Sequence, residues 1–310
     1  SRGNPLRKYI AEFVATFFLV FVGAGSIISE VFLANFRVTD SFGLLGVALA
    51  HGLALAVAIA AVAHISGGHV NPAVTIAFLL SRRISARDAV GYIVSQCAGA
   101  IAAAFILKGF SPSEVYNFTG GGVPALAQGI SPLAAVGIEG VLTFFLAFAI
   151  WGVAVDKRGP NVIAPLAIGL TVTFDTLAGG AFTGAAMNPA RWLGPAVASG
   201  AFGNFFVWIV GPILGALLGS VLYDTFLLDD QDDLGMMEPE EEDVLVKTGD
   251  RSRAEAERSQ MRDREERISE RQEEVEREMP SRPSPPPPSD EPPPMPPPES
   301  PPNAPPTPPT

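Results

Sequence analysis

The sequence predicts an all-α membrane protein with six transmembrane helices and two re-entrant half-helices arranged as an inverted repeat. Three observations support this: a long stretch poor in charge, six apolar runs of membrane-spanning length, and two short apolar segments that share a tripeptide. Residues 1–228 hold only 20 of the 53 charged residues, whereas about a quarter of an ordinary soluble domain is charged. This composition argues against a soluble enzyme, and the sequence holds no nucleophile–base pair or phosphate-binding loop.

Six apolar runs have the length of a membrane span, which needs roughly 20 mostly apolar residues. They are residues 9–29, 42–64, 88–107, 132–155, 162–177 and 205–227. Six crossings place both chain ends on one side of the membrane. The segments on that side carry eight Lys or Arg residues and the opposite segments two, so the positive-inside rule predicts cytoplasmic termini. The membrane is left open between the plasma membrane and an organelle or vacuolar membrane.

Two further apolar segments, 69–80 and 187–199, are too short to cross the membrane and follow a full span closely. Their shared tripeptides are Asn71-Pro72-Ala73 and Asn188-Pro189-Ala190. Asn is a favoured N-cap, and Pro in the first helical turn sacrifices no hydrogen bond. We therefore expect two half-helices that begin at membrane depth, where irregular backbone is tolerated only inside protein or beside a watery cavity.

The sequence also repeats around two glutamates, Glu12 and Glu139. Each begins the pattern Glu-x-Val-x-Thr-Phe-Phe-Leu, and each copy contains three spans and one half-helix. The second copy therefore enters the membrane from the opposite side, as in many transport proteins. Buried carboxylates need partners. We expect the loops before the half-helices to supply backbone donors to both glutamates, a structural role; a proton relay is the alternative.

Half-helices that meet at their N-termini direct two positive dipole ends toward the membrane midplane. The amides of Asn71 and Asn188 can each donate to a permeating oxygen, whose own hydrogens then turn outward and interrupt a proton relay. The backbone before each motif is expected to be extended and to present carbonyl acceptors as a ladder. The residues of this ladder are Gly67, Gly68, His69, Gly184 and Ala186.

Two Asn-Pro-Ala motifs within an inverted hydrophobic repeat resemble the aquaporins, or major intrinsic proteins. The resemblance covers roughly residues 6–228 and includes His64–Thr75, Met187–Arg191 and Gly211-Pro212. It implies a passive channel that conducts water and excludes protons and ions. It also implies a homotetramer with one pore per subunit, and no cofactor or metal.

The family's spacing places the selectivity filter on His51, Thr176, Ala185 and Arg191. Arg191 would donate hydrogen bonds and repel cations, because a charge at that depth marks a functional site. His51 is similar to the filter histidine of the tonoplast intrinsic proteins of plants; the alternative is a core histidine satisfied locally. Thr176 and Ala185 are small and predict a wider opening than in water-only channels. Asp175 departs from the family pattern and could meet an outer-loop donor or add negative charge to the vestibule.

Glycerol facilitators place Asp directly after the Arg that follows the second motif, and a basic residue shortly after that; Trp192 and Ala196 stand at those places here. Trp208-Ile209 replaces the aromatic-Trp pair usual in strict water channels. We therefore expect the channel to conduct water together with some small neutral solutes. The candidate solutes are ammonia, urea, peroxide and glycerol. One alternative is a membrane scaffold or adhesion protein that uses the same fold, with the tail as its interaction module. Another is an ion-coupled transporter.

Residues 229–310 form a different segment, with 10 basic and 23 acidic residues and 19 of the 29 prolines. An acidic start, a charge-rich helical pattern and a proline-rich end predict a disordered cytoplasmic tail without a core of its own. Residues 282–288 fit an R-x-x-P-x-x-P ligand for SH3-type grooves, with a linker or spacer as the alternative. The single cysteine, Cys97, excludes a disulfide framework and does not match the constriction cysteine of mercury-sensitive aquaporins.

Overall fold

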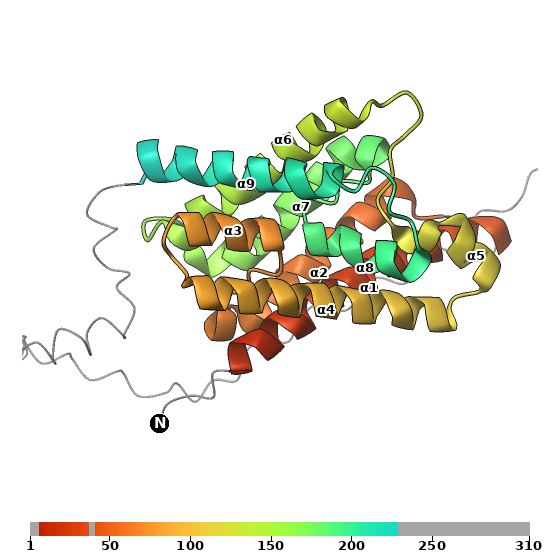
Figure 1. Ribbon diagram of the computed structural model, residues 1–310, viewed down its shortest axis with the longest axis horizontal. Coiled ribbons are helices and arrows are strands. Elements are labelled where there is room, and N and C mark those ends of the chain that lie inside the picture. The colour runs from red at the N-terminus through yellow and green to blue at the C-terminus, as the bar shows by residue number, and fades with distance from the viewer. Residues whose placement is uncertain (1–5, 37–40, 229–310) are drawn as a thin grey trace, which may run out of the picture. The chain divides into compact units, whose positions relative to one another are not determined.

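The computed structural model describes residues 6–36 and 41–228, which form helices and connecting loops. Six of these helices are long and apolar enough to cross a membrane, so the predicted all-α membrane architecture is confirmed. In chain order (Figure 1) the helices are α1 (Leu6–Phe36), α2 (Gly43–Ser66), α3 (Pro72–Leu80), α4 (Ala86–Phe110), α5 (Ser113–Phe118), α6 (Pro132–Ile150), α7 (Ala164–Thr183), α8 (Pro189–Ser199) and α9 (Val207–Phe226). A π-helical turn, Trp151–Val155, extends α6 at its end.

Two of the predicted spans are too short. Helix α1 continues to Phe36, and α7 continues to Thr183, beyond its predicted end at residue 177. The added part of α7 contains Gly179, where a Cβ would come within 2.5 Å of Leu142 in α6. Close packing between these two helices therefore explains the glycine at this position.

The two halves of the chain pack in the same way. Helix α1 packs along α2 and α4, and α6 packs along α7 and α9 in the corresponding arrangement. The two half-helices exchange partners, because α8 packs mainly on α4 of the first half and α3 mainly on α9 of the second. Figure 1 shows α3 and α8 between α4 and α9. This exchange locks the halves together and brings the N-termini of the half-helices to the centre.

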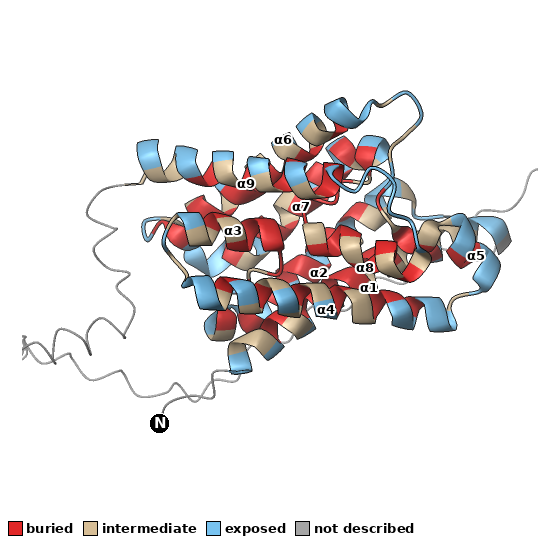
Figure 2. Ribbon diagram, viewed as in Figure 1, coloured by how far each residue is buried: buried red, intermediate tan, exposed pale blue. Residues whose placement is uncertain are grey.

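The outward faces of the long helices are apolar and exposed, whereas their inward faces are buried (Figure 2). Val94 in α4, Phe174 in α7 and Leu218 in α9 are all more than 60% exposed. A soluble protein rarely exposes such a continuous apolar surface. It is the surface expected to face lipid, and the polar groups of the molecule are therefore concentrated inside.

The loop between α6 and α7 is hydrogen-bonded to the end of α9. The Arg158 guanidinium donates to the backbone carbonyl of Leu227 at 2.7 Å and to both carboxylate oxygens of Asp156. These hydrogen bonds hold the pKa of Asp156 below its usual range. Because the pKa of Asp156 is lower in the folded state, this contact stabilises the protein at pH values above the ordinary pKa of Asp. The stabilisation is lost as the pH falls through the lowered pKa of the folded state. The predicted tail, 229–310, with its SH3-type motif, lies outside the described residues.

Candidate functional site: a pore between two half-helices

A buried carboxylate holds the loop that precedes the first half-helix. Glu12 of α1 is fully buried and accepts hydrogen bonds from the Ser66 hydroxyl at 2.7 Å and from the backbone N–H groups of His69 at 2.9 Å and Val70 at 2.7 Å. The Gln96 amide donates to the same carboxylate at 2.8 Å. Four donors offset the cost of burying this charged group.

Glu139 of α6 has the same position in the second half. It is fully buried and accepts from the Thr183 hydroxyl at 2.6 Å and from the backbone N–H groups of Ala186 at 3.0 Å and Met187 at 2.8 Å. The inverted repeat is therefore reproduced in individual hydrogen bonds. In each half, one glutamate fixes the backbone immediately before a half-helix.

The backbone that precedes the half-helices is not extended throughout, so the expectation for Gly67–His69 and Gly184–Ala186 is wrong at Gly67, Gly68, Gly184 and Ala185. The left-handed region is occupied by Gly67, Gly68 and Val70 in the first loop and by Gly184, Ala185 and Met187 in the second. Left-handed turns rotate successive peptide planes and allow two neighbouring N–H groups to reach one carboxylate. Three of these residues are not glycine, and each such residue costs roughly 1 kcal/mol or more. The hydrogen bonds to the glutamates maintain this strained backbone.

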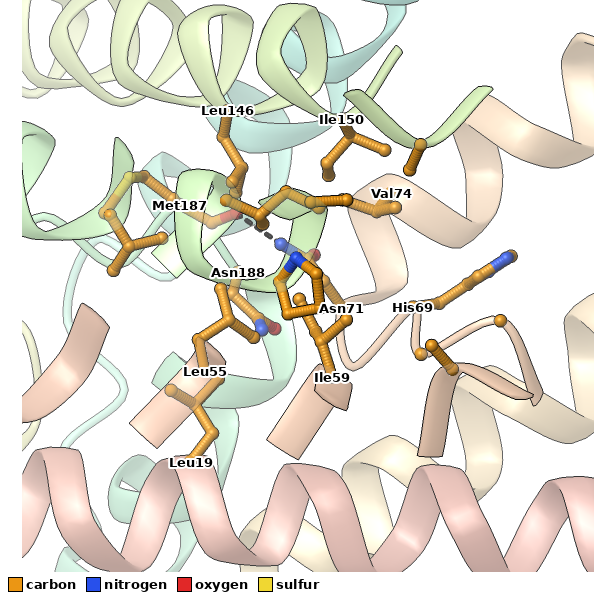
Figure 3. Close-up of a pocket in the computed structure, with 18 of the residues that line it drawn as sticks. Leu19, Leu55, Ile59, His69, Asn71, Val74, Leu146, Ile150, Met187 and Asn188 are labelled. Carbon is orange, nitrogen blue, oxygen red and sulfur yellow. Dashed lines mark hydrogen bonds between the residues drawn. The ribbon is translucent and has the colours of Figure 1, made fainter. Parts of the chain in front are cut away.

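Each motif asparagine caps its own half-helix and also contacts the opposite loop (Figure 3). The Asn71 side-chain oxygen accepts from Ala73 N at 2.9 Å, and its amide donates to Met187 O at 2.8 Å. Asn188 accepts from the backbone N–H groups of Ala190 and Arg191, and its amide donates to Val70 O at 2.8 Å. The half-helices therefore meet tip to tip. An amide has two N–H donors, so one N–H of each asparagine remains for another acceptor.

A cavity of about 330 Å³ passes this meeting point. Its wall contains Asn71, Asn188 and His69, together with many apolar side chains such as Leu55 and Ile150 (Figure 3). The predicted ladder residues that line it are Gly67, Gly68, His69 and Ala186. Pro72, Ala73, Gly184, Pro189 and Ala190 are not among the lining residues; they belong to the half-helix starts and to the C-cap of α7. A mainly apolar wall with a few placed polar groups suits small neutral molecules.

Arg191 lies on this wall, is 2% exposed and is held on two sides. Its Nε and Nη2 atoms lie 3.2 and 3.1 Å from Nε2 of His51, and Nη1 donates to Gly122 O at 2.9 Å. The other ring nitrogen of His51, Nδ1, lies 2.8 Å from Val47 O. A carbonyl only accepts, so Nδ1 carries the hydrogen and Nε2 is the acceptor for Arg191. His51 is therefore neutral and positions the arginine, in addition to having a local partner.

Sequence reasoning missed several groups that build this site. The carbonyls of Val70, Met187 and Gly122 accept the hydrogen bonds that position the asparagines and Arg191. Backbone carbonyls are present in every residue, so they leave no signal in a sequence. Gly122 has a positive φ, and a Cβ there would lie 2.9 Å from the backbone of Ala24, which explains the glycine. Gln96 had a detectable signal, because it is a polar residue within an apolar run.

The sequence matches the family model described as Major intrinsic protein over residues 1–223. The chain belongs to the major intrinsic proteins, the aquaporins. It is 43% identical over 222 residues to "Aquaporin TIP2-1" of Arabidopsis thaliana, a match that covers 70% of this chain and 86% of that protein. It is 42% identical over 233 residues to "Aquaporin TIP1-2" of Zea mays, covering 74% and 89%.

A solved structure supports the same fold. The X-ray structure of the aquaglyceroporin from Plasmodium falciparum is similar to this aquaporin with a TM-score of 0.60 and 26% sequence identity. The match covers 74% of this chain and 99% of that chain. The matched part of this chain therefore corresponds to nearly the full length of a solved structure.

The four predicted filter residues differ in their surroundings. His51, Ala185 and Arg191 line the cavity together. Thr176 is buried in α7 but is not among the lining residues, and its hydroxyl has no hydrogen-bond partner among the described residues. Its predicted place in the filter therefore remains a prediction.

Mercury is expected to inhibit this aquaporin only weakly. Cys97 lies in α4, is half-buried, packs against the apolar cluster around Val20 and Ala100, and is not among the residues that line the cavity. Vesicle swelling with and without mercuric chloride measures the effect. A strong block that thiols reverse and that Cys97→Ser abolishes would contradict this expectation.

Proposed function

We propose that this aquaporin is a passive channel for water and small neutral solutes that excludes protons and ions. The observation that carries the proposal is the tip-to-tip meeting of α3 and α8, where Asn71 and Asn188 each keep one free N–H beside the cavity. No step of this function requires a cofactor, a metal or a catalytic residue. Movement follows the solute's own gradient.

The two asparagines account for proton exclusion. A water oxygen that accepts from both amides directs its two hydrogens along the pore in opposite directions. The chain of hydrogen bonds then reverses at this molecule and cannot relay a proton. The N-terminal ends of α3 and α8 add positive potential at the same point, and Arg191 adds a full charge farther along. These features together oppose hydronium and metal cations.

The solute range follows from the small filter residues. Ala185, and Thr176 at its family position, leave more room than large side chains would, so ammonia, urea and peroxide are proposed as permeants, with glycerol at the upper size limit. Trp192 occupies the position where glycerol facilitators carry Asp, which favours water over glycerol as the main permeant. Similarity to plant aquaporins supports water as the primary solute.

We propose a homotetramer with one pore per subunit, cytoplasmic termini, and residues 1–228 and 229–310 as the channel and the tail. The exposed apolar faces of the long helices provide surface both for neighbouring subunits and for lipid. The excess of basic residues on the side of the chain ends supports the orientation. The proline-rich tail is proposed to act as a spacer, and binding to an SH3-type partner is the second option.

Swelling of reconstituted vesicles tests the channel directly. Water flux well above that of protein-free vesicles, with a low activation barrier, is the expected result. A flux equal to that of lipid alone would contradict a channel and favour the scaffold function. Accumulation of a solute against its own gradient would favour a coupled transporter.

Substitution of Thr176 by His tests the filter width. The larger ring is expected to reduce urea and glycerol flux more than water flux, because a narrower opening excludes the larger molecules first. Parallel stopped-flow measurements of the three permeants provide the comparison. An equal reduction of urea, glycerol and water flux would show that Thr176 is not part of the filter.

A further inference from the structure

The two long helices that lead into the pore loops, α2 and α7, each end on a buried residue. These residues are Ser66 and Thr183. The last carbonyls of a helix have no partner within the helix, and a buried carbonyl without a donor costs about 1–3 kcal/mol. The carbonyls of Ser66 and Thr183 therefore each need a donor from outside their own helix.

A buried aromatic side chain supplies that donor in each half of the chain. The Tyr92 hydroxyl of α4 donates to Ser66 O at 2.7 Å. The indole Nε1–H of Trp208 in α9 donates to Thr183 O at 3.0 Å. Both hydrogen bonds connect residues more than 20 positions apart, so they join separate helices and are not part of a local turn.

Tyr92 and Trp208 occupy the same position in the inverted repeat. Residues 92–100 read Tyr-Ile-Val-Ser-Gln-Cys-Ala-Gly-Ala, and residues 208–216 read Trp-Ile-Val-Gly-Pro-Ile-Leu-Gly-Ala. The two segments agree at five of these nine positions when Tyr92 is aligned with Trp208. The repeat therefore places two chemically different donors, a phenol and an indole, at one structural position.

The helix contacts of the two glycines shared by these segments support the same alignment. A Cβ on Gly99 of α4 would meet the backbone carbonyl of Phe13 in α1. A Cβ on Gly215 of α9 would meet the backbone carbonyl of Gly140 in α6. Phe13 and Gly140 directly follow the two paired glutamates in the sequence. Tyr92 and Trp208 are therefore equivalent in the structure as well as in the sequence.

The held carbonyls control the direction in which each loop leaves its helix. The hydroxyls of Ser66 and Thr183 also donate to the buried glutamates, but a side-chain bond leaves the following peptide plane free to rotate. A bond to the carbonyl fixes that plane, because the peptide unit is rigid. The next residues are Gly67 and Gly184, which have positive φ and the wide conformational freedom of glycine. The plane therefore depends on an outside contact.

The backbone that follows each held carbonyl forms part of the cavity wall. Residues 67–69 and 185–187 all line the cavity. The glutamates hold the far end of each loop through the N–H groups of residues 69–70 and 186–187. Each loop is therefore held at both ends, by an aromatic donor at its start and by a carboxylate at its end.

Each donor ring also packs against a residue of the loop or half-helix that it serves. The ring of Tyr92 meets that of His69 edge-on, with centroids 5.1 Å apart. The ring of Trp208 stacks on that of Trp192, with centroids 5.8 Å apart and an interplanar angle of 9°. Trp192 directly follows Arg191 in α8. This packing fixes the orientation of each donor relative to the pore wall.

We propose that Tyr92 and Trp208 are positioning residues, each of which holds the peptide plane at the start of one pore loop so that the backbone lining the passage keeps a single direction. This inference rests on the proposed channel function for its effect on water flux. The holding of the loops is measured separately, by amide hydrogen exchange.

The first test uses the full chain in vesicles and measures water flux per folded protein and amide exchange in both loops. Tyr92→Phe removes only the hydroxyl. Exchange at residues 67–71 is expected to become about 3- to 10-fold faster, the effect of losing one hydrogen bond from the closed loop. Water flux per folded protein is expected to fall. Exchange at residues 184–188 should stay unchanged, whereas a general loss of stability would accelerate exchange in both loops.

Trp208→Phe and Trp208→Tyr test the second loop as a matched pair, because the two new rings differ by one hydroxyl. Trp208→Phe should accelerate exchange at residues 184–188 and lower water flux. Tyr92 shows that a hydroxyl at the equivalent position reaches the equivalent carbonyl. Trp208→Tyr is therefore expected to restore slower exchange and higher water flux relative to Trp208→Phe.

Tyr116→Phe is the control for removal of a buried hydroxyl. Tyr116 of α5 is buried, and its hydroxyl has no hydrogen-bond partner among the described residues. Its removal breaks no hydrogen bond. Exchange in both loops and water flux should therefore match those of the unmodified protein.

Each outcome decides the proposal. Unchanged exchange at residues 67–71 in Tyr92→Phe would overturn it, and so would faster exchange without any loss of water flux. Equal behaviour of Trp208→Tyr and Trp208→Phe would overturn the role of the indole N–H. Absence of water conduction in the unmodified protein would contradict the proposed function, while exchange would still show whether the donors hold the loops. Should Trp208→Phe reduce the amount of folded protein, Tyr92→Phe decides the question by itself.

Discussion

Replacement of Arg191 by Val is expected to open the channel to cations and protons. Arg191 is the only Lys or Arg residue that lines the cavity in the described part of the chain. A unit charge about 6 Å from a permeating cation, at an effective dielectric constant of about 20, opposes it by about 3 kcal/mol. Removal of that charge should increase cation flux by roughly 100-fold. Proton and sodium flux into vesicles loaded with indicator dyes provides the measurement.

Two further variants separate charge from geometry. Arg191→Lys keeps the positive charge but loses the planar group that contacts His51 and Gly122, so cations should stay excluded while solute flux changes. Arg87→Val removes a positive charge from an exposed position in α4 and should leave ion flux unchanged. If proton and sodium flux through Arg191→Val stays as low as through the unmodified protein, the half-helix ends and the two asparagines are sufficient to exclude cations.

Replacement of Glu139 by Ala is expected to prevent formation of a stable channel. The substitution leaves three buried donors without their acceptor: the Thr183 hydroxyl and the N–H groups of Ala186 and Met187. An unsatisfied buried donor costs about 1–3 kcal/mol, so the loss of the acceptor for three donors is expected to cost at least about 3 kcal/mol. The strained backbone at Ala185 and Met187 would then lose its support. Thermal unfolding in detergent, together with water flux per folded protein, measures both effects.

Three further variants test whether the effect comes from the loss of the buried acceptor. Glu139→Gln retains one acceptor oxygen and should be intermediate. Glu12→Ala should behave like Glu139→Ala, because Glu12 has the same role in the first half. Glu114→Ala, at an exposed position in α5, should be neutral. A melting temperature for Glu139→Ala equal to that of the unmodified protein would refute the structural role.

The sequence was informative where the physical signal is local. Apolar runs specify spans because each span must bury its own backbone hydrogen bonds in lipid. Asn followed by Pro specifies a helix start within one turn, and the half-helices begin at Pro72 and Pro189 as these tripeptides predict. Arg191 was recognisable as a lone charge in apolar surroundings. The predicted end of α7 at residue 177 was too early. The close contact that explains Gly179 beyond that point is made by Leu142 of a different helix, which the local sequence does not reveal.

The sequence by itself therefore determined the helices, the inverted repeat, the two half-helices and the family. Only the tertiary structure decided how the parts meet: the left-handed backbone of the two loops, the bonds of each asparagine to the opposite loop, and the positioning of Arg191 between His51 and Gly122. The reason is that the groups involved are mostly backbone N–H groups and carbonyls. These are the same in every residue, and which of them meet is set by contacts between residues more than 50 positions apart.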